Sequence, residues 1–130
     1  MNWWSRFNVY WIISVLYMGL IFILSSFPPP MELPSFSFAD KLAHLLEYGV
    51  LASLIYFALK KSRASVHPIF IPFLIASLYG VSDELHQYFV PGRDADLLDA
   101  VANGVGAFVF PLGIHALEHG SGKRSLDTYQ

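Results

Sequence analysis

Four long apolar segments, separated by short polar or Pro-rich stretches, dominate the chain. They cover residues 7–27, 42–59, 69–90 and 97–117. An α-helix needs about 20 mainly apolar residues to cross the hydrocarbon core of a bilayer, so this pattern predicts an all-α integral membrane bundle of four transmembrane helices. The first segment holds no charged residue and is longer than the apolar core of a signal peptide, which is about 7–15 residues. We therefore expect an uncleaved anchor within a single domain, residues 1–130.

The positions of lysine and arginine predict how the four spans are oriented. One side of the four-span arrangement carries Arg6, the cluster of Lys60, Lys61 and Arg63, and the tail residues Lys123 and Arg124, whereas the other side carries only Lys41 and Arg93. Loops rich in lysine and arginine stay in the cytoplasm. We therefore expect both termini to be cytoplasmic and the Pro91-Gly92-Arg93 turn to be external.

Polar side chains gather at three segment ends that this topology places on the external face. Successive residues of an α-helix are about 100° apart, so residues three or four apart share a face. The first stripe comprises Asp40, His44 and Glu47, flanked by Lys41 and Tyr48. The second comprises Asp83 and Gln87 on one face with Tyr79, and His86 borders it. The third comprises Asp96, Asp99 and Asn103. Glu84 points about 100° away from its stripe. Together the stripes predict a water-accessible, outward-facing polar pocket between the second, third and fourth segments.

Composition supports a membrane protein and excludes several classes of site. Hydrophobic residues make up 55% of the chain and charged residues 14%, against about 25% charged in a typical soluble domain. The chain has no cysteine, which excludes disulfides, thiolate chemistry and cysteine metal sites. A net charge of −2 and the absence of a basic stripe argue against a nucleic-acid partner. The apolar segments make membrane lipids the expected surroundings of the chain.

The chemistry of the stripes has more than one interpretation. His44 has Asp40 and Glu47 as helical neighbours, and it could act as a general base, a metal ligand or a hydrogen-bonded strut. His44 and Asp83 are the candidate catalytic residues, but no compact metal motif or serine-enzyme pattern accompanies them. Carboxylates and a histidine suit several divalent cations, so the metal and any cofactor stay open.

Two further interpretations concern the basic residues of this face. Arg93 follows a Pro-Gly turn, and its planar guanidinium suits a phosphate or carboxylate, unless it only extends to the membrane interface. In a purely structural network, Lys41 and Arg93 would instead neutralise the aspartates at positions 83, 96 or 99, because buried charges need partners.

Two stretches of the chain resemble a known family. They are DKLAHLLEYGVL, residues 40–51, and SDELHQYFVPGRDADLLDAVANGVG, residues 82–106. Both are similar to the signatures of the VanZ-like bacterial membrane proteins, whose founding member accompanies glycopeptide-resistance genes and lowers susceptibility to teicoplanin. The resemblance implies a multi-pass protein of the bacterial cytoplasmic membrane and no settled reaction. The motif positions that it carries over are Asp40, Lys41, His44, Tyr48, Asp83, Glu84, Gln87, Arg93, Asp99 and Asn103, whereas His86 and Glu47 are kept on helical geometry alone.

Three functions are compatible with these observations. The first is modulation of susceptibility to glycopeptide antibiotics at the cell envelope, by engaging a lipid-linked anionic component, or the antibiotic itself, at the polar pocket. The second is an intramembrane hydrolase or transferase acting on a lipid-linked phosphate, with or without a metal. The third is a structural bundle whose polar network only pairs helices. The sequence does not decide whether the protein is an enzyme, or whether it forms oligomers.

Overall fold

The computed structural model describes residues 7–28 and 38–124, and every regular element within these residues is an α-helix. The helices are α1 (Val9–Ser25), α2 (Phe38–Lys61), α3 (Phe70–Tyr88) and α4 (Leu97–Arg124). An all-helical fold with four helices is therefore confirmed. Arg6 lies outside the described residues, as do the side chains of Lys123 and Arg124, so part of the charge pattern used for orientation has no structural description.

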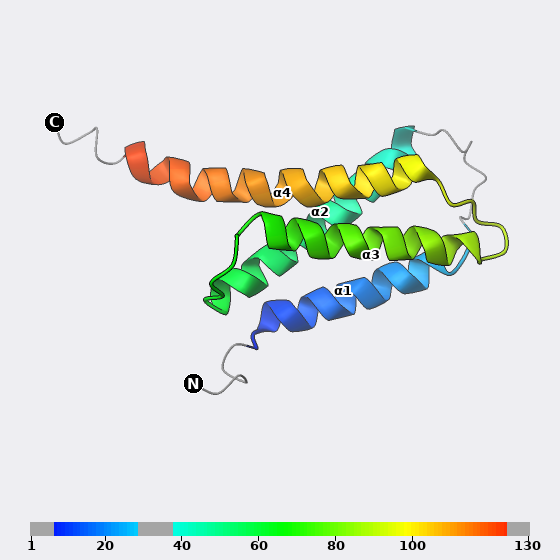
Figure 1. Ribbon diagram of the computed structural model, residues 1–130, viewed down its shortest axis with the longest axis horizontal. Helices are drawn as coiled ribbons and strands as arrows, with labels where there is room; N and C mark the ends of the chain where they lie inside the picture. The colour runs from blue at the N-terminus through cyan, green and yellow to red at the C-terminus, as the bar shows by residue number, and fades with distance from the viewer. Residues whose placement is uncertain (1–6, 29–37, 125–130) are drawn as a thin grey trace.

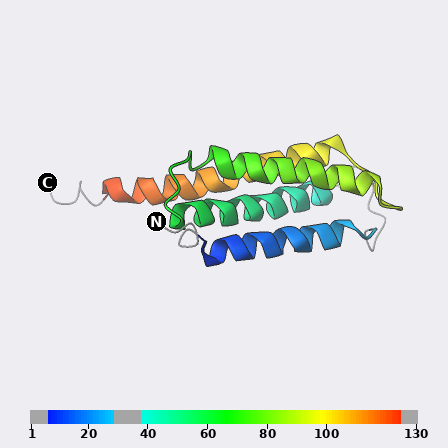
Figure 2. The same cartoon turned by 60° about the horizontal axis from the view of Figure 1, so that its bottom comes forward.

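The four helices run side by side along the long axis of the molecule (Figures 1 and 2). The first turn of α1 and the last turns of α4 lie at one end, so the chain passes back and forth an even number of times. Helix α2 is central: it packs most extensively on α4 and also contacts α1 and α3. Its residues supply most of the buried core, which comprises Tyr48, Leu51, Ala52 and Ile55 with Ile21, Ala76 and Ala107.

Small residues allow the central helices to approach closely. A Cβ placed on Gly106 of α4 would overlap the carbonyl oxygen of Leu45 in α2. A Cβ on Gly80 of α3 would lie 3.1 Å from the side chains of both Asn103 and Tyr48. Lipid provides no hydrophobic drive for helix association, so close packing of this kind stabilises membrane bundles.

Polar side chains define where three of the helices begin. The Asn8 side chain accepts a hydrogen bond from the Tyr10 amide and donates one to the Ala58 carbonyl, which ties the start of α1 to the end of α2. His67 Nδ1 accepts from the Phe70 amide at the start of α3. Asp96 Oδ1 accepts from the Leu98 amide and caps α4. Side-chain oxygens at these positions satisfy backbone donors that the helix itself leaves unpaired.

Two helices are long and apolar enough to cross a membrane by length and composition, Phe38–Lys61 and Leu97–Gly120. Helix α1 is equally apolar but has 17 residues, shorter than the predicted segment 7–27. It exposes a nearly continuous apolar surface, which includes Ile12, Val15, Leu16, Leu20 and Ile23. Soluble proteins rarely expose apolar surface on this scale. The described fold therefore supports a membrane protein with two clear candidate spans.

Candidate functional site

One end of the bundle brings together the three predicted polar groups. The last turn of α1, the first turns of α2, the last turns of α3 and the start of α4 all lie there (Figure 1). The expected convergence of the stripes at one end is therefore observed. The polar residues buried at this end are His44, Asp83, Glu84, Gln87, Asp99 and Asn103, together with Ser25 of α1.

Lys41 is the centre of an ion-pair network between α2 and α4. Its ammonium lies 2.6 Å from Asp96 and 2.5 Å from Asp99 Oδ1, and 3.7 Å from Asp40. The hydrogen bond from Lys41 is the main cause that lowers the pKa of Asp96, which sits in the connection before α4. The structural interpretation correctly anticipated this pairing of Lys41 with the aspartates of the fourth helix.

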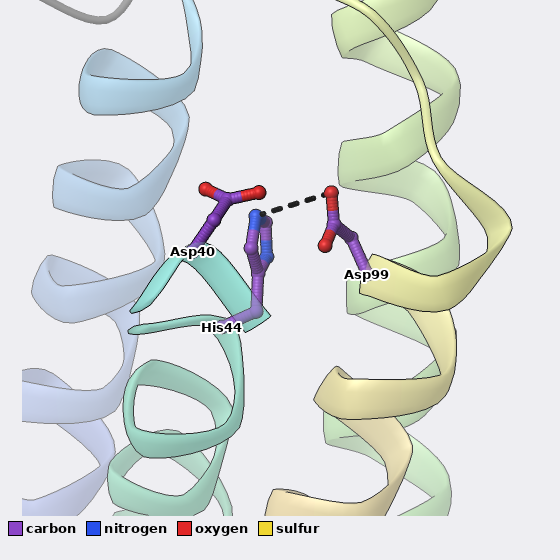
Figure 3. A group of neighbouring side chains, drawn as sticks. All are labelled: Asp40, His44 and Asp99. Atoms are coloured by element: carbon purple, nitrogen blue, oxygen red, sulfur yellow. Dashed lines mark ion pairs between the residues drawn. The ribbon is translucent and has the colours of Figure 1, made fainter. Parts of the chain in front are cut away.

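His44 contacts three polar side chains from the two neighbouring helices. Its Nδ1 lies 3.0 Å from Asn103 Oδ1 and 3.8 Å from Glu84 Oε1, and its Nε2 lies 3.7 Å from Asp99 Oδ2. Figure 3 shows the imidazole ring between the carboxylates of Asp40 and Asp99. One donor atom from each of Asp40, His44 and Asp99 lies within 4.8 Å of the others, so these three residues have the dimensions of a metal-binding set.

A second hydrogen-bonded group surrounds Asp83, which is 4% exposed. Its Oδ2 accepts from the Tyr48 hydroxyl at 3.2 Å and from Gln87 Nε2 at 3.1 Å. Its other oxygen, Oδ1, is buried and has no hydrogen-bond partner among the described residues. Glu84 Oε1 and Asn103 Nδ2 are also buried without a partner there. Unpaired buried polar atoms are uncommon and often mark functional sites.

The turn before α4 positions Arg93 against the end of α1. Gly92 has φ +80°, and the Arg93 amide donates to the Val90 carbonyl at 3.1 Å, as in a type II turn with proline second and glycine third. The guanidinium donates to the carbonyls of Phe27 at 2.8 Å and Leu24 at 2.9 Å, with a longer bond of 3.4 Å to Gln87. Arg93 therefore pairs with the carbonyl end of α1, and not with the aspartates that the structural interpretation gave it.

A cavity of about 340 Å³ lies beside these groups. Its polar lining comprises Asp40, His44, Glu47, Asp83, Gln87 and Arg93, with Ser25, and its apolar lining comprises Ile21, Leu24, Phe27, Pro28 and Ala43. The prediction placed the pocket between the second, third and fourth segments. In this cavity α1 instead contributes to the apolar wall, and no residue of α4 is part of the lining. The sequence of α1 carries no charged residue, so no ionisable group pointed to this wall.

Glu84 differs from the helical-wheel prediction, whereas Tyr79 and His86 have partners on or near α1 that the prediction did not name. Glu84 was expected to point away, yet it is 7% exposed, faces His44, and accepts from the Asp96 amide at 3.2 Å. The Tyr79 ring lies beside that of Tyr48, and its hydroxyl donates to the Met18 carbonyl of α1. His86 lies 3.0 Å from the Ser26 hydroxyl and stacks on Phe22 of α1. Only the packing of the four helices decides which flank of each stripe faces which neighbour.

Comparison with known proteins agrees with the resemblance of the two motifs. No curated protein and no solved structure matches the chain. The family model described as VanZ/LLP1 matches residues 2–117, a range that includes every residue of the candidate site described above. The chain is a member of the VanZ/LLP1 family.

Proposed function

We propose that the protein is a four-span component of the bacterial cytoplasmic membrane that modulates susceptibility to glycopeptide antibiotics. In this proposal both termini are cytoplasmic, and the polar end of the bundle faces outward. There it engages a lipid-linked anionic component of the envelope. Membership of the VanZ/LLP1 family supports the cellular role.

The observation that carries the binding proposal is the mixed lining of the cavity. Leu24 and Phe27 contribute apolar surface to the lining, and His44, Glu47 and Arg93 contribute polar groups. A lipid-linked headgroup has the same division, with an apolar chain on one side and a polar group on the other. A volume of about 340 Å³ is within the range of small-molecule sites, about 300–1,000 Å³.

Arg93 is the group best suited to contact an anion in this cavity. It is the one lysine or arginine among the residues that line it within the described chain. Two of its donors bond to the carbonyls of Leu24, in α1, and Phe27, just after it. The 3.4 Å bond to Gln87 is long and therefore weak, so an anion that binds more strongly can replace it. Lys41, by contrast, is occupied by Asp96 and Asp99, so its contribution to ligand binding is indirect.

A second candidate function is hydrolysis or transfer of a lipid-linked phosphate. The observation that favours it is the pairing of a buried histidine with buried carboxylates beside a cavity, since low dielectric and neighbouring charges adapt such groups for acid–base chemistry. In the hydrolytic form, His44 takes a proton from water as the water oxygen bonds to phosphorus. The phosphoester bond then breaks, and the departing alkoxide takes up that proton from the His44 imidazolium, which returns to its neutral form.

Antibiotic susceptibility of cells expressing the protein tests these proposals. Wild type would be compared with Arg93→Lys, His44→Gln and Asp83→Asn, with membrane levels of each protein quantified. His119→Gln serves as the histidine control, because His119 is exposed and bonds only to the His115 carbonyl of its own helix among the described residues. Arg63→Lys serves as the arginine control, because Arg63 lies in the turn after α2.

The outcomes separate the three functions. Raised teicoplanin tolerance that falls in graded fashion with Arg93→Lys supports binding, whereas complete loss with His44→Gln at equal abundance supports an enzyme. Reduced protein levels for all three site variants, with normal controls, would point to a structural network. Equal tolerance with and without the wild-type protein would remove the proposed role in susceptibility.

A further inference from the structure

The environment of His44 fixes which ring nitrogen presents a lone pair. The amide oxygen of Asn103, 3.0 Å from Nδ1, can only accept a hydrogen bond, so Nδ1 carries a proton in this arrangement. A neutral His44 then has an unprotonated Nε2, and this atom faces the Asp99 carboxylate at 3.7 Å. A lone pair directed at a carboxylate is unfavourable unless a proton or a metal ion lies between the two groups.

The charges of the same cluster leave a deficit of positive charge. The carboxylates of Asp40, Asp96 and Asp99 surround one ammonium, that of Lys41. With His44 neutral, these four side chains carry a net charge of −2, which one divalent cation would neutralise. Glu84, whose buried Oε1 has no hydrogen-bond partner among the described residues and lies 3.8 Å from His44 Nδ1, adds a further carboxyl group beside the ring.

We propose that Asp40, His44 and Asp99 bind a divalent transition-metal ion such as Zn²⁺ or Mn²⁺. Imidazole nitrogen with carboxylate oxygen is a donor set that both ions accept. Ligands of tetrahedral Zn²⁺ at bond lengths of about 2.1 Å lie roughly 3.4 Å apart. The 3.7 Å between His44 Nε2 and Asp99 Oδ2 is close to this separation. The donor atoms of all three residues lie within 4.8 Å of one another, so binding would draw them closer together.

The residues behind the three ligands have the arrangement of an outer shell. Metal-binding histidines usually donate their second ring nitrogen to an oxygen acceptor, and Asn103 provides that acceptor. Lys41 bonds to Asp99 Oδ1, which leaves Oδ2 directed at His44. Asn103 and Lys41 are thus positioning residues: they orient two ligands toward a common point without binding the ion themselves.

Metal binding by the purified full-length protein in detergent tests this inference directly. After chelator treatment, Zn²⁺ would be added and its stoichiometry and affinity measured by mass spectrometry and calorimetry, and Mn²⁺ binding would be followed by electron paramagnetic resonance. We expect one ion per chain. We expect His44→Gln and Asp99→Asn each to weaken affinity by at least about 10-fold.

Two matched controls address other binding places. Asp94→Asn changes an exposed aspartate near the same end, and His119→Gln removes one member of a histidine pair whose rings lie 4.1 Å apart near the end of α4. Both variants should bind as wild type does. Thermal unfolding of each apo-protein shows whether a variant is folded, and Asn103→Ala, which removes no ligand, should weaken binding while keeping a stoichiometry of one.

Any of three results would overturn the proposal. These are less than about one-fifth of an ion per chain, affinity unchanged in both ligand variants, or loss of the ion only with His119→Gln. An imidazolium at His44 paired with Asp99 would then account for the cluster. The measurement needs no assay of antibiotic tolerance, so a failure of the metal site and a failure of the proposed function are distinguishable.

Discussion

Gly106 of α4 is a position at which one added methyl group should have a large effect on the bundle. A Cβ there would overlap the Leu45 carbonyl oxygen and lie 2.8 Å from the carbonyl carbon and 3.0 Å from the Cα of Leu45. Carbon atoms in contact are about 3.5–4.0 Å apart, and the carbonyl oxygen of Leu45 would lie closer still, so α2 and α4 would have to separate by more than about 1 Å. Backbone atoms cannot rotate away as a side chain can. We therefore place the cost near the upper end of the overpacking range, about 3 kcal/mol.

Helix propensity partly offsets this cost and supplies the control. Alanine favours a helix over glycine by up to about 1 kcal/mol, so Gly106→Ala should lower the free energy of unfolding by about 2 kcal/mol. Gly104→Ala, two residues away, meets only Ser77 Oγ at 3.9 Å, which is an ordinary contact. That variant should be neutral or up to about 1 kcal/mol more stable.

Reversible unfolding by SDS titration in mixed micelles, followed by circular dichroism, measures both free energies. The two alanine variants should differ by about 2–3 kcal/mol. Equal free energies for them would refute the reasoning, because the close α2–α4 approach at Leu45 would then not constrain the bundle.

Two further predictions concern pH and orientation. The hydrogen bond from Lys41 lowers the pKa of Asp96 in the folded protein, so the pair stabilises the fold above the usual aspartate pKa of about 4, and this contribution is lost as the pH falls through the lower folded value. The stability difference between wild type and Asp96→Asn should therefore shrink as the pH falls below about 4, and a difference independent of pH would contradict the assignment. A phosphatase reporter fused after Arg63 should be inactive and one fused after Gly92 active, because the proposal places the first turn in the cytoplasm and the second outside; the reverse pattern would overturn the orientation.

The helices could be predicted from the sequence because apolar length and periodicity are local properties. Each of the four predicted segments corresponds to one helix, in the same order. The boundaries were less accurate, and α2 begins at Phe38 where the prediction began at residue 42. Lys41 could join the helix because Asp99 of α4 and Asp96, just before α4, pair with it across the interface, and Asp40 lies 3.7 Å from the same ammonium. That contact between distant parts of the chain is not visible in local hydropathy.

The candidate site could be predicted in composition but not in arrangement. Helical spacing correctly grouped Asp40 with His44, and Asp99 with Asn103, on single faces. It could not show that Glu84 faces His44, since this depends on how α3 is rotated about its axis against α2. The Arg93 contacts were missed for another reason. Its partners are the backbone carbonyls of Leu24 and Phe27. Every residue has a backbone carbonyl, so the amino-acid sequence does not indicate which of them will accept a hydrogen bond.

The cavity and the proposed metal site share a wall, and this links the two proposals. Asp40 and His44 both line the cavity and belong to the metal-binding set. Without a bound cation, an anionic headgroup entering the cavity would meet the carboxylates of Asp40, Glu47 and Asp83 with Arg93 as its one fixed positive partner among the described lining residues. A divalent ion held by Asp40 and His44 would neutralise the excess negative charge of that lining. If both proposals hold, anionic ligands should bind the metal-loaded protein more tightly than the apo-protein, and by linkage the ligand should raise the affinity for the metal by the same factor.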